Sequence, residues 1–165
     1  MELNDKQIAE FWHRSYTTVD GLWFMKVEEK YGFRTALEVD NEVWKVLPKI
    51  QARMLKSLAK AGDGIETLFE CITTKLELEG FVFDAEKDED NTNFNVTVKR
   101  CPWHDLLVKS GRTELSGDVG SVICNTEYSV WASEFGDNIC FDLQGQICKG
   151  SESCVLSFSH RNPQT

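Results

Sequence analysis

Four cysteines and one glutamate in the second half of the chain are the residues best suited to chemistry. Cys101, Cys124, Cys148 and Cys154 belong to a set of six cysteines, and Glu127 lies one helical turn after Cys124. Four thiolates, or three with a carboxylate, satisfy zinc, and four thiolates also hold iron–sulfur clusters. The CxxC pair of a zinc ribbon does not occur in the sequence. These five residues are the candidate metal ligands, with zinc as the first candidate and an iron–sulfur cluster as the alternative.

The segment KRCPWHDLL places one of these thiols where it could act as a nucleophile. Proline is favoured at the first position of a helix, so Pro102 predicts that Cys101 is the N-cap of a short helix. Free backbone N–H groups, the helix dipole and the neighbouring Lys99 and Arg100 all favour the thiolate. The alternative is a small buried residue that only fills the capping position. His104 follows one turn later as a candidate second ligand or base.

The segment CNTE, in a predicted long helix, puts the Cys124 thiol and the Glu127 carboxylate on one face. Tyr128 and Trp131 extend that face, which is typical of a core or a pocket wall. A buried glutamate is unfavourable unless a metal, an arginine or a substrate pairs with it. The alternative is that Glu127 is an ordinary exposed helix residue. The candidate pocket residues are Trp23, Trp103, His104 and Trp131.

The periodicity of the apolar residues predicts the elements that must position these side chains. Up to about residue 80 the spacing is helical, with helices expected from Asn4-Asp5, over 21–32, from Asp40 or Asn41 to Gly62 with a kink at Pro48, and over 64–79. Alternation then predicts a hairpin around the acidic run 84–93, a short helix from Pro102, a helix over 117–135 and a second hairpin. We therefore predict one domain, residues 1–165, with a helical half (1–80) and a hairpin–helices–hairpin half (81–160). The expected class is α+β, with N-terminal helices packed on one face of an antiparallel sheet made of two hairpins.

The apolar pattern also predicts the register of the second hairpin. Pairing Ile147 with Cys154 and Leu143 with Phe158 turns the apolar side chains of both strands toward the helices. Cys154 then points to the core, and Cys148 begins the turn CKGSES. The long helix leads directly into this hairpin, so Cys148 and Cys154 are expected to lie near Cys124 as reduced thiols.

Composition restricts the function classes. The chain has 165 residues and a net charge of −9, and an acidic surface repels nucleic acids and anionic membranes. The first residues show no basic start followed by an apolar core, and no apolar run reaches the ~20 residues of a membrane span. We therefore expect a soluble cytoplasmic protein that binds a small molecule, with no nucleic-acid or membrane partner.

Three motifs carry a resemblance to known families. CPW (101–103), CNTE (124–127) and CKGSESCVLSF (148–158) resemble the C-terminal half of the L-2-amino-thiazoline-4-carboxylic acid hydrolase-like family. DGLWFMKVEEKYG, ALEVDNEVW and IQARMLK are similar to the helical half of related small prokaryotic cytosolic proteins. The spacing of Cys148, Gly150 and Cys154 is distantly similar to vinyl-reductase-type sensor domains, some of which bind zinc through cysteines and an acidic residue. That likeness implies Cys124, Cys148 and Cys154 as ligands, with Glu127 or Cys101 as the fourth, because Gly145 replaces the family's acid.

Three functions follow as hypotheses. The first is a metal-supported domain that binds a small molecule. The second, implied by the hydrolase-like resemblance, is hydrolysis of a cyclic C=N or amide-like substrate, with Cys101 as nucleophile and Glu127 moving protons. The third is a non-catalytic interaction protein, which slow reaction of the cysteines would favour.

Overall fold

The structure is a computed structural model, and it describes residues 1–161. Residues 1–42 form one compact unit, and the described residues from 43 onward form a second. The first contains α1 (Asp5–Tyr31) and most of α2 (Phe33–Trp44), which crosses the boundary. The expectation of a single domain stays a prediction.

Helix α1 is one continuous helix, whereas the sequence predicted a break before Gly21. Asn4 caps it as expected: its side chain accepts from the backbone N–H of Gln7, and the Gln7 side chain accepts in return from the N–H of Asn4. Gly32, at φ 88°, ends the helix. Glycine inside a helix is less favourable than alanine by only about 1 kcal/mol. At Gly21 the hydrogen bonds of the helical turns on either side outweigh this difference.

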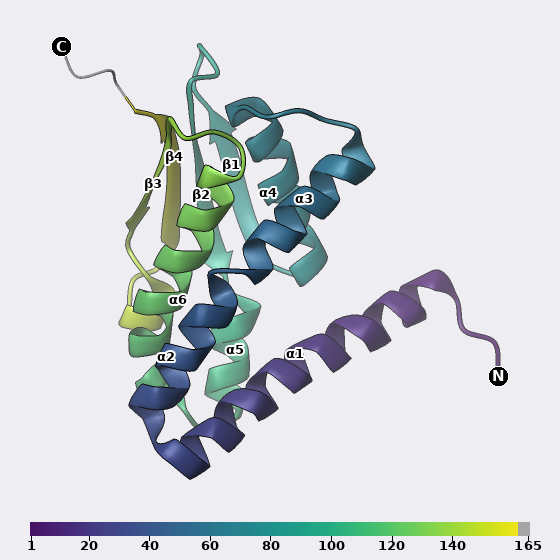
Figure 1. The fold of residues 1–165 in the computed structure, drawn as a ribbon, viewed down its shortest axis with the longest axis vertical. Helices are drawn as coiled ribbons and strands as arrows, with labels where there is room; N and C mark the ends of the chain where they lie inside the picture. The colour runs from purple at the N-terminus through teal and green to yellow at the C-terminus, as the bar shows by residue number, and fades with distance from the viewer. Residues whose placement is uncertain (162–165) are drawn as a thin grey trace. The chain divides into compact units, whose positions relative to one another are not determined.

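The second unit begins with two helices and continues into the sheet (Figure 1). Its elements, in chain order, are α3 (Leu47–Ala59), α4 (Ile65–Glu79), β1 (Val82–Lys87), β2 (Asn93–Arg100), α5 (Pro102–Lys109), α6 (Thr113–Ser133), β3 (Ile139–Gln144), the short 3-10 helix η1 (Ile147–Lys149) and β4 (Cys154–His160). The predicted helix from residue 40 to 62 is wrong: α2 ends at Trp44 and α3 starts anew at Leu47. Pro48 sits in the first turn of α3, where its missing N–H is tolerated, so it starts a helix instead of kinking one.

The strands form one antiparallel sheet in the order β1-β2-β4-β3, which confirms the predicted α+β class with two hairpins. The last strand in the sequence, β4, therefore lies inside the sheet between β2 and β3. The predicted register of the second hairpin is wrong by two residues, since Leu143 pairs with Leu156 and Phe141 with Phe158. A shift of two preserves the faces of a strand, so Leu156 and Phe158 are buried as predicted.

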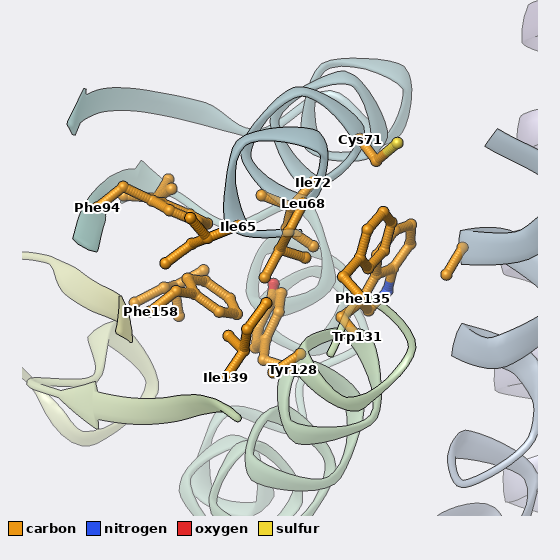
Figure 2. Close-up of a cluster of buried hydrophobic side chains, with 14 of the residues drawn as sticks. Ile65, Leu68, Cys71, Ile72, Phe94, Tyr128, Trp131, Phe135, Ile139 and Phe158 are labelled. Carbon is orange, nitrogen blue, oxygen red and sulfur yellow. The ribbon is translucent and has the colours of Figure 1, made fainter. Parts of the chain in front are cut away.

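The main core lies between the sheet and the helices α4 and α6. Figure 2 shows Phe94 and Phe158 from the strands facing Ile65 of α4 and Tyr128 of α6. The Phe94 and Phe158 rings stack with centroids 4.7 Å apart. Trp131, fully buried, stacks in parallel on Phe135. This packing holds α4 and α6 side by side, and with them Lys75 and Glu79 of α4 and Glu127 of α6.

Candidate functional site

A buried group of charges joins α4 to α6. The ammonium of Lys75 lies 2.5 Å from Oε1 of Glu127 and 3.0 Å from Oε2 of Glu79. These three side chains are 4%, 6% and 8% exposed. The indole N–H of Trp103 also donates to Oε2 of Glu79, at 3.2 Å. We call Lys75, Glu79 and Glu127 the buried triad.

The surroundings keep the cation of the triad charged. Burial alone would lower the pKa of Lys75, but the carboxylates of Glu127 and Glu79 outweigh it and raise that pKa. The rings of Phe81 and Tyr128 add a favourable environment, with the ammonium 5.4 Å from each centroid. The raised pKa favours the protonated ammonium, which holds the carboxylates of Glu79 and Glu127 and so ties α4 to α6.

Glu127 is buried and paired, which settles the choice left open by its sequence position. Burial raises its pKa, and the charge of Lys75 opposes that rise. The face it shares with Cys124, Tyr128 and Trp131 is core, as one of the two readings predicted. Sequence reasoning missed the partner, Lys75. The available signal was a lysine among the apolar helical positions of α4, with a glutamate four residues later.

Cys101 occupies its predicted N-cap position, but its thiol is not activated. It precedes Pro102 at the start of α5 and makes no capping hydrogen bond. Burial raises the pKa of Cys101 to about 11, although the N–H groups of His104 and Trp103 favour the thiolate. The expectation of a lowered pKa is therefore wrong, because burial outweighs the helix terminus. At neutral pH this sulfur is a protonated thiol, which disfavours it as a nucleophile.

The structure brings the four predicted cysteines together. The pKa of Cys124 lies well above its usual value because the thiol is buried and because Glu127, Cys101, Cys148 and Cys154 are near enough to disfavour its thiolate. Burial also raises the pKa values of Cys148 and Cys154. All six cysteines are free thiols. The expected proximity of Cys124, Cys148 and Cys154 is therefore seen in the structure.

The turn that carries Cys148 is clamped onto α6. The hydroxyl of Ser116 donates to the carbonyl oxygen of Cys148 at 3.4 Å, and the amide of Gln146 donates to the carbonyl of Gly120 at 3.1 Å. A Cβ atom at Gly120 would lie 2.6 Å from the sulfur of Cys148, so only glycine leaves room for that sulfur. On the other side of the turn, the N–H of Ile147 donates to the sulfur of Cys154 at 3.2 Å. These contacts account for the two-residue shift in register, because η1 takes Ile147 out of the strand.

The thiols do not have the arrangement of a metal centre. Among residues 1–161, no group of three or more His, Cys, Asp or Glu side chains is placed to hold a metal ion. Glu127 is already bound to Lys75. A zinc or iron–sulfur site at Cys101, Cys124, Glu127, Cys148 and Cys154 stays a prediction, and it would require these side chains to move.

The predicted pocket residues fall in different places. Trp131 is core, and its indole nitrogen is buried without a hydrogen-bond partner in the described part of the chain. Trp103 packs edge-on against Trp44, with centroids 5.7 Å apart, and His104 beside it is half-buried. Trp23 belongs to the first unit, on α1, and is 70% exposed.

A second feature is an apolar face of α3 that the structure leaves exposed. Ile50, Met54 and Leu58 follow one another at intervals of four residues and are 57%, 55% and 74% exposed. The opposite side of the same helix buries Ala52 completely and packs Leu55 on the core. Their spacing is that of one apolar face of a helix, and the structure buries the other side. We call Ile50, Met54 and Leu58 the α3 ridge.

Comparisons with known proteins concern the fold and the family. The model of a family of unknown function, DUF6125, matches residues 4–146. Comparison with curated proteins gives no match. Among solved structures, the chain is similar to a trafficking protein particle complex subunit 3 from Naegleria fowleri, covalently bound to palmitic acid, with a TM-score of 0.50 and 9% identity over 98% of this chain and 99% of that one. At this identity the likeness shows the fold alone. The resemblance to thiazoline-carboxylate hydrolases stays a prediction.

Proposed function

This chain belongs to the family of unknown function DUF6125, and we propose that it is a non-catalytic subunit of a protein assembly that docks a partner on the α3 ridge. The exposed apolar face of α3 is the observation on which the proposal rests. Fully burying an aliphatic side chain is favourable by about 1.5–3 kcal/mol, so covering the exposed parts of Ile50, Met54 and Leu58 would contribute on the order of 3–5 kcal/mol. The similar fold of a trafficking complex subunit supports a subunit role.

Basic side chains border the ridge along one side and indicate the chemistry of the partner. Lys49, Arg53 and Lys56 lie along α3, Lys60 caps its C-terminus, and no acidic residue occurs between Val43 and Gly62. Lys56 is paired with Asp63 at 2.8 Å. Arg53 is held by both carboxylate oxygens of Glu134, at 2.7 and 3.0 Å. Lys49 and Lys60 are exposed. The partner that fits is a helix or loop with an apolar face bordered by acidic side chains.

A protein partner is favoured over the alternatives. The net charge of −9 opposes binding to an anionic membrane. Self-pairing of antiparallel α3 helices about a twofold axis would place one basic border against the other. Catalysis by a cysteine nucleophile is disfavoured by the raised pKa values of Cys101 and Cys124.

The test compares Met54→Glu with Leu78→Glu, a matched control on α4 where the leucine is 68% exposed. Proteins cross-linked to the tagged chain in its own cells are identified for each variant, and each candidate partner is then purified and titrated against the chain. We expect a purified partner that binds the unmodified chain and Leu78→Glu equally, and Met54→Glu at least about tenfold more weakly.

Two outcomes contradict the proposal. One is a set of partners that Met54→Glu keeps with unchanged affinity. The other is binding to vesicles of phosphatidylserine and phosphatidylcholine that Met54→Glu abolishes and Leu78→Glu preserves, which would make the ridge a membrane contact.

A further inference from the structure

Helix α1 carries an apolar stripe that nothing within the first unit covers. None of the residues Asp5–Tyr31 is buried. Phe11, Trp12 and Trp23 are 59%, 66% and 70% exposed. Ile8, Val19, Leu22 and Met25 are further exposed apolar residues of the same helix. Their spacing of three, four and seven residues places these seven side chains along one side of α1, and we call them the α1 stripe.

The size of the stripe is that of an interface. An aromatic side chain offers roughly 150–250 Å², so Phe11 and Trp12, at 59% and 66% exposure, present on the order of 200–300 Å². Two copies of the stripe, with their aliphatic residues added, reach the ~1,000 Å² that a specific dimer needs.

The pattern of the stripe fits a second copy of the same helix running in the opposite direction. In heptad terms, Ile8, Ser15 and Leu22 occupy a positions, and Phe11, Thr18 and Met25 occupy d positions. In an antiparallel pair each a residue meets a d residue. One register gives the layers Ile8 with Met25, Phe11 with Leu22, and Ser15 with Thr18. Each large side chain then meets another large one, and the small polar residues meet at the centre.

The charges beside the stripe agree with the same register. The flanking e positions bring Asp5 opposite Lys26 at both ends of the pair and Trp12 opposite Val19 in between. The g positions bring Gln7 opposite Glu28, so no like charges meet. In a parallel pair, Phe11 would face Phe11, and neither Asp5 nor Lys26 would meet an opposite charge on the second helix. Lys26 then keeps only Glu29 of its own helix, at 2.7 Å. We therefore propose that the chain forms a homodimer in which the α1 stripes of two copies pack as an antiparallel two-helix coiled coil.

The experiment measures the mass of the purified full chain by light scattering and sedimentation over a range of concentrations. We expect a dimer for the unmodified chain and a monomer for Phe11→Glu, with circular dichroism showing that the variant remains folded. Met54→Glu, which changes the α3 ridge, should leave the dimer intact, so failure of the proposed function and failure of this dimer are distinguishable. A chain that stays monomeric, or a dimer that tolerates Phe11→Glu, overturns the proposal.

Charge exchange tests the antiparallel register and separates it from packing within one chain. Asp5→Lys and Lys26→Glu each create two repulsive pairs and should weaken the dimer about tenfold. The double variant Asp5→Lys/Lys26→Glu should recover the original affinity. A mixture of the two single variants should form heterodimers more tightly than either variant dimerises alone, since both charge pairs are then attractive. Absence of rescue in the mixture contradicts the antiparallel pairing.

Discussion

Replacing Lys75 by methionine should destabilise the protein more than any surface change, because it leaves two carboxylates buried together. Lys75 holds Glu127 at 2.5 Å and Glu79 at 3.0 Å in a setting where all three side chains are less than a tenth exposed. Removing one partner of a buried ion pair destabilises a protein by about 3–5 kcal/mol. Since small domains are stable by roughly 5–15 kcal/mol, the variant should be close to unfolding.

The loss should depend on pH in a defined direction. Without the ammonium, burial and the neighbouring carboxylate raise the folded-state pKa of Glu127 further above its unfolded value. A carboxyl with a raised folded pKa favours folding when protonated, and that contribution is lost as pH rises through the folded pKa. Lys75→Met should therefore be less destabilising near about pH 5 than near about pH 8.

Urea unfolding followed by tryptophan fluorescence measures both effects. The control is the neutral triple variant Lys75→Met/Glu79→Gln/Glu127→Gln, which removes every charge of the triad and should regain at least half of the lost free energy of unfolding. A loss below about 1 kcal/mol for Lys75→Met, equal at both pH values, would refute the buried triad as a source of stability.

Three further changes test the thiols and the clamp. Burial raises the pKa of Cys101 to about 11 from an ordinary 9.0, so about one hundredth of the usual fraction of thiolate is present at pH 7. Alkylation of Cys101 should therefore be slow at pH 7 and become faster toward pH 11. An alkylation rate that levels off above about pH 8.5 would contradict the burial of this thiol. Gly120→Ala should lower the free energy of unfolding by about 1–3 kcal/mol through its clash with the Cys148 sulfur, and Cys148→Ala in the same chain should relieve that loss; an unrelieved loss would place the strain elsewhere. In the unmodified protein the raised pKa of Glu127 should make stability fall as pH rises above about 4.5, and Glu127→Gln should remove that slope in urea unfolding; an unchanged slope would assign it to other groups.

Local signals in the sequence predict the elements well where a cap or a breaker is decisive. Gly64 precedes α4 and Pro102 starts α5, as expected. The end of α4 at Gly80 was not decided by the sequence, because LELEGFVF also suits a strand. Gly21 was a misleading signal, because the unfavourable free energy of one glycine is smaller than the stabilisation from the rest of a long helix. Pro48 was misleading because proline is tolerated in the first turn of a helix as well as at a kink.

Side-chain direction is predicted less well than secondary structure, because it depends on contacts between distant segments. The buried and exposed sides of β4 were predicted correctly, because the alternation of apolar residues determines them. The pairing of β4 with β3 was not, because η1 determines which residues lie opposite one another. The gathering of Cys124, Cys148 and Cys154 follows from chain connectivity and was predictable. The pairing of Lys75 with Glu127 joins residues 52 positions apart, and no local pattern contains it. The exposure of Ile50 and Met54 is of the same kind, because periodicity identifies an apolar face without saying what covers it.

The place of β4 between β2 and β3 has a consequence for the order in which the chain folds. β2 and β3 are each made before β4 and are not neighbours in the sheet, so one edge of β2 and both edges of β3 stay unpaired until β4 arrives. Phe94 and Phe141 stay without the Phe158 ring against which both pack. Closure of the sheet is therefore a late event that depends on contacts distant in sequence, a topology that folds slowly. A ribosome-bound chain that lacks β4 would expose an edge of β2 and the unpaired β3, and chaperones that shield such edges should bind it until synthesis of β4 is complete.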